Sequence, residues 1–196
     1  MGLDMWIFSA KKVDESRLPE VPHADDLDVT DLHYIVKEDI EGEEELIEEL
    51  RPFFIERKGI AKYTDWDMLR KAFDIPDGAY PGGYSFNGAE WEFRFYDNGK
   101  SYPVKISDEE FEKCRKEHEV EFIIYDLKEI TYFRKDYELE NSIYEVYNKY
   151  TGKDIENCGY YRLTKDMIKE LNERDKSFRM LKLSEDDDTL YYHEWY

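Results

Sequence analysis

The stretch AEWEFRFYDNGKSYPVKI, residues 89–106, carries the clearest structural signal in the chain. In its first half, Trp91, Phe93 and Phe95 alternate with charged residues, a pattern typical of a strand with one buried face. The tetrapeptide DNGK, residues 97–100, follows, and an Asn-Gly pair between two such segments is typical of a two-residue hairpin turn. The sequence therefore predicts an antiparallel β-hairpin here.

Further strands are expected on both sides of this hairpin, because short apolar or alternating segments recur there. They lie at residues 3–12, 32–36, 120–127 and 160–163, and residues 178–183 and 189–196 look like a closing hairpin around SEDDD. Hairpins mixed with helices, without regular βαβ alternation, favour the α+β class. The length of 196 residues suits a single domain, residues 1–196, in which residues 75–125 could form a hairpin-containing insertion.

Amphipathic helices are predicted where apolar residues recur at intervals of three or four. Ser107 is expected to cap one of them through a capping box, Thr164 another, and either Thr64 or Asp65 a third. Gly152 is placed to end the longest. The five predicted helices cover residues 43–56, 63–73, 107–117, 127–152 and 165–175. Between the elements, proline and glycine predict loops at residues 13–31 and 74–88.

The segment EDIEGEEELIEEL, residues 38–50, holds eight carboxylates and no basic side chain. As an α-helix it would extend about 20 Å, with one negative charge per roughly 2.5 Å against about one per 1.7 Å on duplex DNA. Like-charge pairs at i,i+4, such as Glu44 with Glu48, cost roughly 0.2–0.5 kcal/mol each. Because the chain tolerates that cost, we infer that the dense negative charge of this segment is itself under selection. We therefore expect a partner-binding surface at Glu41, Glu43, Glu44, Glu45, Glu48 and Glu49.

The whole chain is strongly acidic, with a formal net charge of −20. Half of the excess lies in residues 1–58, which hold 17 acidic and 7 basic residues. Such a field repels nucleic-acid backbones and anionic membranes, and it attracts basic surfaces. The composition therefore argues against direct binding of nucleic acid or membrane. It predicts a basic protein partner, for example one that itself binds nucleic acid.

Features of the sequence that report on cellular location are consistent with one another. The two cysteines, Cys114 and Cys158, have no paired spacing that would indicate a disulfide framework, which fits a reducing cytosol. No apolar run approaches the roughly 18 residues of a membrane span. The opening MGLDMWIF lacks the basic region of a signal peptide. We therefore expect a cytoplasmic protein.

Three stretches match the pattern of a known family: MGLDMW at residues 1–6, EITYFRKDYEL at 129–139 and NCGYYRLTKDMIKELNE at 157–173. They resemble, in the same order, three segments of small bacteriophage and prophage proteins. These segments are the opening MGLDMY, a helix with a Tyr-Trp/Phe-Arg-Lys pattern, and a Tyr-containing strand that leads into a Leu-rich helix. The family often has a His after the Arg-Lys pair, where this chain has Asp136 to Leu139. The resemblance implies a phage or mobile-element setting and no particular catalytic activity.

Candidate sites for chemistry are few. Cys114 and His118 lie four residues apart on a predicted helix and could share a metal ion, but a zinc site needs further ligands and the other histidines are scattered. We expect an inward-facing Cys and a solvated His instead, and neither a metal nor a cofactor. Among the 48 acidic residues, Asp4 and Glu129 are the least arbitrary candidates for acid–base chemistry. A structural hydrogen bond or ion pair is the expected role of both, and no catalytic residue is predicted.

Three functions remain open. The preferred one is an acidic protein that acts by protein–protein contact, including as a nucleic-acid mimic that inhibits a host defence or DNA-binding protein. In that function Arg134, within TYFRKDY, could add an interface anchor beside its aromatic neighbours. The alternative places Tyr132 and Phe133 in the core and leaves the charge of Arg134 solvated. The second is a small hydrolase or transferase with a site near Asp4, Tyr132, Arg134 and Tyr161. The third is a homo-oligomeric accessory protein with tyrosines at its interface.

Overall fold

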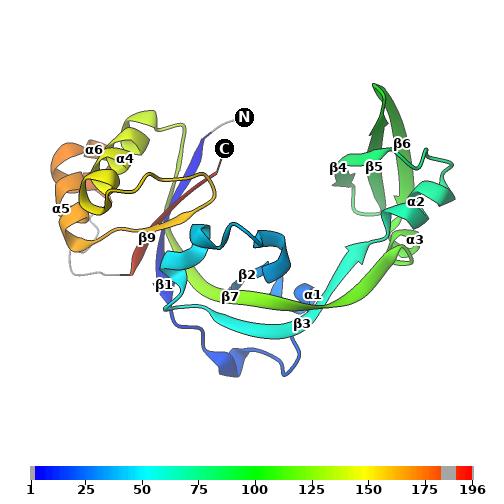
Figure 1. The fold of residues 1–196 in the computed structure, drawn as a ribbon, viewed down its shortest axis with the longest axis horizontal. Helices are drawn as coiled ribbons and strands as arrows, with labels where there is room; N and C mark the ends of the chain where they lie inside the picture. The colour runs from blue at the N-terminus through cyan, green and yellow to red at the C-terminus, as the bar shows by residue number, and fades with distance from the viewer. Residues whose placement is uncertain (1–2, 182–188, 196) are drawn as a thin grey trace. The chain divides into compact units, whose positions relative to one another are not determined.

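The computed structural model describes residues 3–181 and 189–195 and has the predicted α+β fold (Figure 1). Antiparallel strand pairs combine with several helices. The chain divides into two compact units. The first contains Met1–Gly59 and Val120–Tyr196, and the second contains Ile60–Glu119, which lies between those two segments in the sequence.

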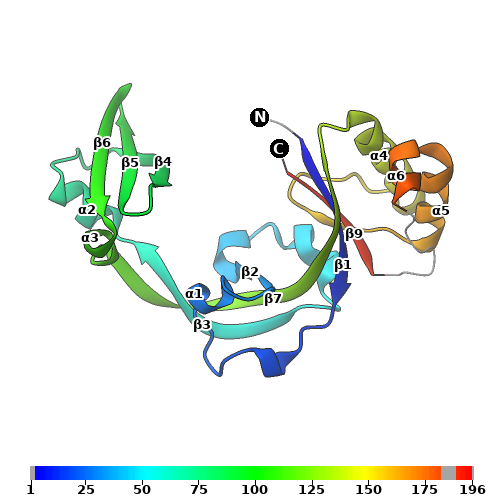
Figure 2. The same ribbon diagram turned by 180° about the vertical axis from the view of Figure 1, so that it is seen from behind.

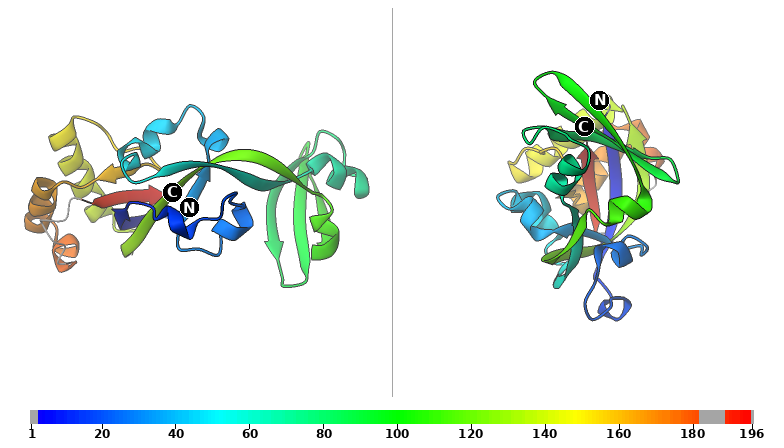
Figure 3. Two further views of the ribbon diagram at one scale, coloured as in Figure 1. Left: turned by 90° about the horizontal axis from the view of Figure 1, so that it is seen from below. Right: turned by 90° about the vertical axis from the view of Figure 1, so that its right-hand side faces the viewer.

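The first unit is built on a six-stranded sheet. The strand order is β2 (His33–Val36), β7 (Arg115–Arg134), β1 (Asp4–Lys11), β9 (Leu190–Trp195) and β8 (Tyr160–Arg162), with β3 (Ile55–Thr64) also paired to β7. The strands predicted at residues 3–12, 32–36, 120–127 and 160–163 are thereby confirmed. Strand β1 is central, because Asp4 lies opposite Arg134 on one side and Trp195 on the other. The two ends of the described chain are therefore close together (Figure 3).

Successive side chains of β1 point to opposite faces of this sheet, as the period of a strand requires. Met5 and Ile7 belong to one core, which also contains residues of α4 (Tyr137–Thr151), α5 (Lys165–Arg174) and α6 (Lys176–Met180). Figure 2 shows these three helices grouped beside β1 and β9. Phe8 and Ala10 belong to a second core on the other face.

The helix predicted over residues 127–152 is correct only from Tyr137 onward. Residues up to Arg134 belong to β7, where they pair with β1. This pairing overrides the helical spacing of the apolar residues, because it satisfies the backbone of both strands and packs Phe133 against the helical core. Lys135, with a φ of 58°, separates the strand from the helix.

Helix α4 has a cap at each end. The side chain of Asp136 accepts a hydrogen bond from the N–H of Leu139 at 3.2 Å. Gly152, with a φ of 70°, ends the helix as predicted, because glycine adopts the left-handed conformation without strain. Between these caps, Leu139, Ile143 and Val146 are fully buried and form the inner stripe of the helix.

The amphipathic helix predicted over residues 43–56 is wrong. The chain instead forms two 3₁₀ helices, η2 (Lys37–Ile40) and η3 (Glu44–Leu50), before it enters β3 at Ile55. Gly42 lies between them with a φ of 91° and turns the chain. A 3₁₀ helix has about three residues per turn, so Ile47 and Leu50 share one buried side. Pro52 has no N–H group with which to continue the helix.

The second unit contains a three-stranded sheet with the order β4 (Tyr80–Phe86), β5 (Glu90–Asp97) and β6 (Lys100–Ser107). The hairpin predicted at residues 89–106 is confirmed, since Asp97 pairs with Lys100 across the turn. Asn98 and Gly99 have φ values of 46° and 76°, the positive values that a two-residue Asn-Gly turn requires. Strand β4, by contrast, lies in a stretch predicted as a loop. A register shift between Pro81 and Tyr84 interrupts its pairing with β5, and this irregularity accommodates the two glycines between them.

Helices α2 (Trp66–Ala72) and α3 (Asp108–Glu112) have the predicted caps but are shorter than predicted. Asp65 accepts from the N–H of Met68 at 2.9 Å, and Ser107 caps α3. Residues 63–64 belong to β3, and the chain leaves α3 to enter β7 at Arg115. The loop predicted at residues 13–31 is irregular except for η1 (Glu15–Arg17) and α1 (Ala24–Leu27).

The closing hairpin predicted at the C-terminus is wrong in its first half. Residues 178–180 belong to α6, and β9 pairs with β1 and β8 instead. The SEDDD segment lies outside the described residues. The cap predicted at Thr164 is confirmed, because its side chain accepts a hydrogen bond from the N–H of Met167 at the start of α5.

Candidate functional site

The acidic segment, residues 38–50, does not form one straight line of charge, because η2, the turn at Gly42 and η3 follow one another. The charge spacing expected for a single α-helix therefore does not apply. Glu48 is paired with Arg51 at 2.6 Å, and this hydrogen-bonded contact lowers the pKa of Glu48. Hydrogen bonds from the backbone N–H groups of Glu44 itself and of Gly42 lower the pKa of the Glu44 carboxylate. The exposed acidic residues of the segment are Glu38, Asp39, Glu41, Glu43, Glu44, Glu45 and Glu48.

Glu49 differs from the other acids because its carboxylate is used inside the molecule. One oxygen accepts a hydrogen bond from the hydroxyl of Tyr147, and the other accepts one from the backbone N–H of Arg162. The hydroxyl of Tyr191 donates to the carbonyl oxygen of Glu49 at 2.9 Å. Burial, followed by the hydrogen bond to Glu49, raises the pKa of Tyr147. Glu49 therefore anchors the acidic segment, and both of its carboxylate oxygens are already engaged within the molecule.

Asp4, Tyr132 and Arg134 come together where β1 pairs with β7. The hydroxyl of Tyr132 donates to the carboxylate of Asp4, and Nε of Arg134 lies 3.7 Å from the same oxygen. The hydrogen bond to Asp4 raises the pKa of Tyr132. Arg134 itself is exposed. Asp4, the first residue of β1, thus makes one hydrogen bond and one ion pair. These contacts are the structural role that the sequence predicted for it.

Tyr161 does not join this group. It is buried in the core beneath α4, where its ring lies 5.2 Å from that of Tyr147. Its hydroxyl is satisfied by the backbone of Glu156, from whose N–H it accepts at 2.7 Å. The site proposed from the sequence for a hydrolase or transferase is therefore not assembled as expected.

Cys114 and His118 are not on one helix, so the spacing argument for a shared metal fails. Cys114 is buried in the turn after α3, and His118 is exposed on β7. Burial raises the pKa of the Cys114 thiol. Within residues 3–181 and 189–195, no group of three or more His, Cys, Asp or Glu side chains is arranged to hold a metal ion.

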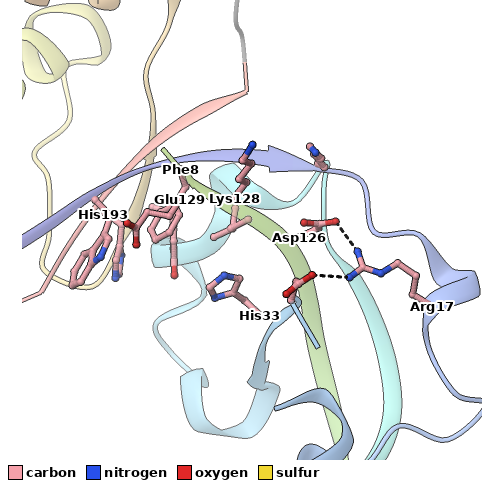
Figure 4. Close-up of a pocket in the computed structure, with 12 residues that line it drawn as sticks. Phe8, Arg17, His33, Asp126, Lys128, Glu129 and His193 are labelled. Atoms are coloured by element: carbon pink, nitrogen blue, oxygen red, sulfur yellow. Dashed lines mark hydrogen bonds and ion pairs between the residues drawn. The ribbon is translucent and has the colours of Figure 1, made fainter. Parts of the chain in front are cut away.

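A cavity of about 840 Å³ lies on the face of the first sheet opposite α4, α5 and α6 (Figure 4). We call it the aromatic cavity. Strands β1, β2, β7, β8 and β9 all contribute to it, which is why no local sequence pattern indicates it. It is lined by Trp6, Phe8, Lys11, Arg17, Asp31, His33, Asp126, Leu127, Lys128, Glu129, Tyr160 and His193.

His193 has a defined hydrogen-bonding state in the aromatic cavity. Its Nδ1 lies 3.0 Å from the carbonyl oxygen of Gly159, and a carbonyl can only accept, so Nδ1 carries the proton. Burial lowers the pKa of His193 and favours the neutral ring, although the hydrogen bond with Gly159 opposes this shift. Nε2 is then an acceptor, and it has no hydrogen-bond partner among the described residues.

The rings around His193 form a continuous aromatic floor. The His193 ring stacks on Tyr160 with centroids 4.3 Å apart and an interplanar angle of 12°. Trp6 lies 5.6 Å from His193, and Phe8 lies between the two histidines, 6.3 Å from His193 and 6.1 Å from His33.

The charged side chains of the aromatic cavity balance one another, three basic against three acidic. Arg17 is already paired, with Asp126 at 3.2 Å and with Asp31 at 3.9 Å, as the dashed lines in Figure 4 show. Lys128 and Glu129 are exposed. The cavity is therefore aromatic at its floor and close to neutral at its rim.

A buried carboxylate pair lies on the opposite face of the sheet, beneath α4. Glu194 is fully buried and accepts hydrogen bonds from the hydroxyls of Tyr144 and Tyr192, the latter at 2.6 Å. Glu140 is also buried, and burial followed by the charge of Glu194 raises its pKa. Because Glu194 alternates with His193 along β9, this network is separate from the aromatic cavity.

Comparison with known proteins returned no match to any protein-family model, to any curated protein or to any solved structure. The resemblance to phage and prophage proteins therefore stays a prediction. Among the helices of the described chain, none combines the length and the apolar character needed to cross a membrane.

Proposed function

We infer that this protein acts by protein–protein contact, and that the exposed carboxylates of the acidic segment bind a basic surface on the partner. The observation that carries this proposal is the anchoring of the segment. Ile47 and Leu50 are buried. The carboxylate of Glu49 accepts two hydrogen bonds, and its backbone carbonyl oxygen accepts a third. A charged array that is fixed before binding loses less conformational entropy when it binds.

The chemistry of the partner follows from the charge. Dense carboxylates attract surfaces rich in Lys and Arg, and such surfaces are typical of proteins that contact nucleic-acid phosphates. The protein would then compete with nucleic acid for the same groove. In the phage setting that the resemblance implies, a host defence protein or a DNA-binding protein is the proposed target.

Arg134 is a second element of the proposal. It is exposed and lies beside Tyr132, which is 43% exposed, so the pair could anchor an interface away from the acidic segment. Its ion pair with Asp4 is at a surface and is therefore of low strength. A partner that bound there would compete with Asp4 for the guanidinium.

The test uses a variant in which Glu41, Glu43, Glu44 and Glu45 are changed to Gln. Partners captured from a host lysate by the native chain are purified, and their affinity for each form is measured at several salt concentrations. Four contacts of phosphate-like density would lose on the order of 100-fold in affinity between about 50 and about 200 mM salt. We expect that loss for the native chain, and weak, nearly salt-independent binding for the variant.

A matched control changes four glutamates elsewhere in the chain to Gln and so removes the same amount of charge. Glu117, Glu119, Glu138 and Glu173 are all exposed and lie outside the acidic segment. If net charge alone decides affinity, both variants will lose binding equally, and the proposal is wrong. It is also wrong if binding of the native chain does not weaken with salt.

A further inference from the structure

The aromatic cavity has the size of a small-molecule site. Its volume of about 840 Å³ falls within the roughly 300–1,000 Å³ of typical ligand pockets. It lies in the first unit alone, and none of the acidic residues of segment 38–50 lines it. An inference about it is therefore independent of the proposed protein contact.

The floor of the cavity favours a flat ligand. Trp6 and His193 are half-buried and line the cavity with their rings, while the buried rings of Phe8 and Tyr160 pack beside them, and His193 stacks on Tyr160 at 4.3 Å. Aromatic side chains grouped in this way are the usual platform for stacking planar heteroaromatic rings. Aliphatic ligands would gain no comparable contact.

The hydrogen-bonding state of His193 requires a donor on the ligand. Nδ1 of His193 donates to the carbonyl oxygen of Gly159, so Nε2 must accept. The contact with Gly159 also fixes the plane of the imidazole ring. A ligand that stacks beside His193 and places an N–H group against Nε2 therefore makes both the aromatic contact and the hydrogen bond.

Charge selects against phosphorylated ligands. Basic and acidic side chains are balanced in the lining, and Arg17 is already committed to Asp126 and Asp31. The chain as a whole carries a formal charge of −20, which disfavours the approach of anions. A neutral ligand meets neither difficulty.

We propose that the aromatic cavity binds a neutral, planar heteroaromatic compound of the nucleobase or nucleoside class, which stacks on Trp6 beside His193 and donates an N–H group to Nε2 of His193. No covalent step is involved. This would give the protein a small-molecule site in addition to its proposed protein contact.

In the test, the full chain is titrated with adenosine, guanosine, cytidine and uridine. Each nucleoside is added up to about 1 mM, so that binding with a dissociation constant as weak as about 1 mM is detected. Binding is followed by NMR shifts of the histidine and indole resonances. At least one nucleoside is expected to bind at a single saturable site and to shift the signals of His193 and Trp6. If none of the four binds, the proposal is overturned.

Variants and ligand analogues then separate stacking from hydrogen bonding. Trp6→Leu and His193→Phe are each expected to weaken binding at least tenfold, while Trp195→Leu, which removes an exposed indole on β9 outside the cavity, leaves it unchanged. Should a variant fail to fold, the native chain still answers the question. An analogue whose exocyclic N–H donors are methylated must bind at least tenfold more weakly than its parent, and a nucleoside 5′-monophosphate more weakly than the nucleoside. Equal or tighter binding of either would overturn the proposal.

Discussion

The hydroxyl group of Tyr147 holds Glu49, and with it the acidic segment, against α4. Replacing Tyr147 by Phe removes only that oxygen, because the ring is 1% exposed and stays in the core. A hydrogen bond to a charged group contributes about 1.5–3 kcal/mol. Since Glu49 is only half-buried and keeps the N–H of Arg162, we expect a loss around or just below the lower end of that range, about 1–2 kcal/mol.

Two measurements report this loss. The midpoint of thermal unfolding of the first unit should fall by roughly 2–8 °C, since a loss of 1 kcal/mol lowers it by about 2–4 °C in chains of this size. Limited proteolysis with an endopeptidase that cleaves after Glu reports the acidic segment directly. If local opening of the segment becomes easier by about 1–2 kcal/mol, cleavage between residues 41 and 48 should accelerate by roughly 5–30-fold.

A double-mutant cycle decides whether the contact is the cause. Glu49→Gln should destabilise the chain by a similar or larger amount, and the double variant should lose little more than Glu49→Gln alone. Tyr137→Phe is the matched control on the same helix, because Tyr137 is 53% exposed. Strict additivity of the two changes, or an equal effect of Tyr137→Phe, would refute the reasoning.

Three further substitutions test the fold. Burial raises the pKa of Glu140 above its ordinary value of 4.5, so its folded form holds a proton more strongly than the unfolded chain, and stability is lost as pH rises above about 4.5. Glu140→Gln should therefore stabilise the protein at pH 8 and change nothing below about pH 4 in urea unfolding; a difference that is constant with pH would contradict this. Asp136→Ala removes the cap on the N–H of Leu139 and should cost about 0.5–2 kcal/mol in thermal unfolding, while Asp136→Asn should cost much less. Gly99→Ala forces a side chain into a φ of 76° and should destabilise the β5–β6 hairpin by about 1 kcal/mol in hydrogen exchange, whereas Gly78→Ala, where φ is not positive and a Cβ meets open space, should not.

Local sequence patterns were sufficient to predict the features that depend on neighbours a few residues away. The hairpin at residues 89–106 follows from its two-residue alternation and its Asn-Gly turn, and both are local. The caps at Asp65, Ser107 and Thr164 were likewise predictable, because each side chain bonds to a backbone N–H three residues along the chain.

The remaining features depend on contacts between distant parts of the chain, because long-range pairing outweighs local propensity. Residues 127–134 have helical spacing, yet they form a strand because β1 offers them a complete pairing partner more than a hundred residues away. The role of Glu49 depends on Tyr147 and Arg162, which lie about as far along the chain. The aromatic cavity exists only where β1, β2, β7, β8 and β9 meet in one sheet, and no sequence window contains more than a part of it.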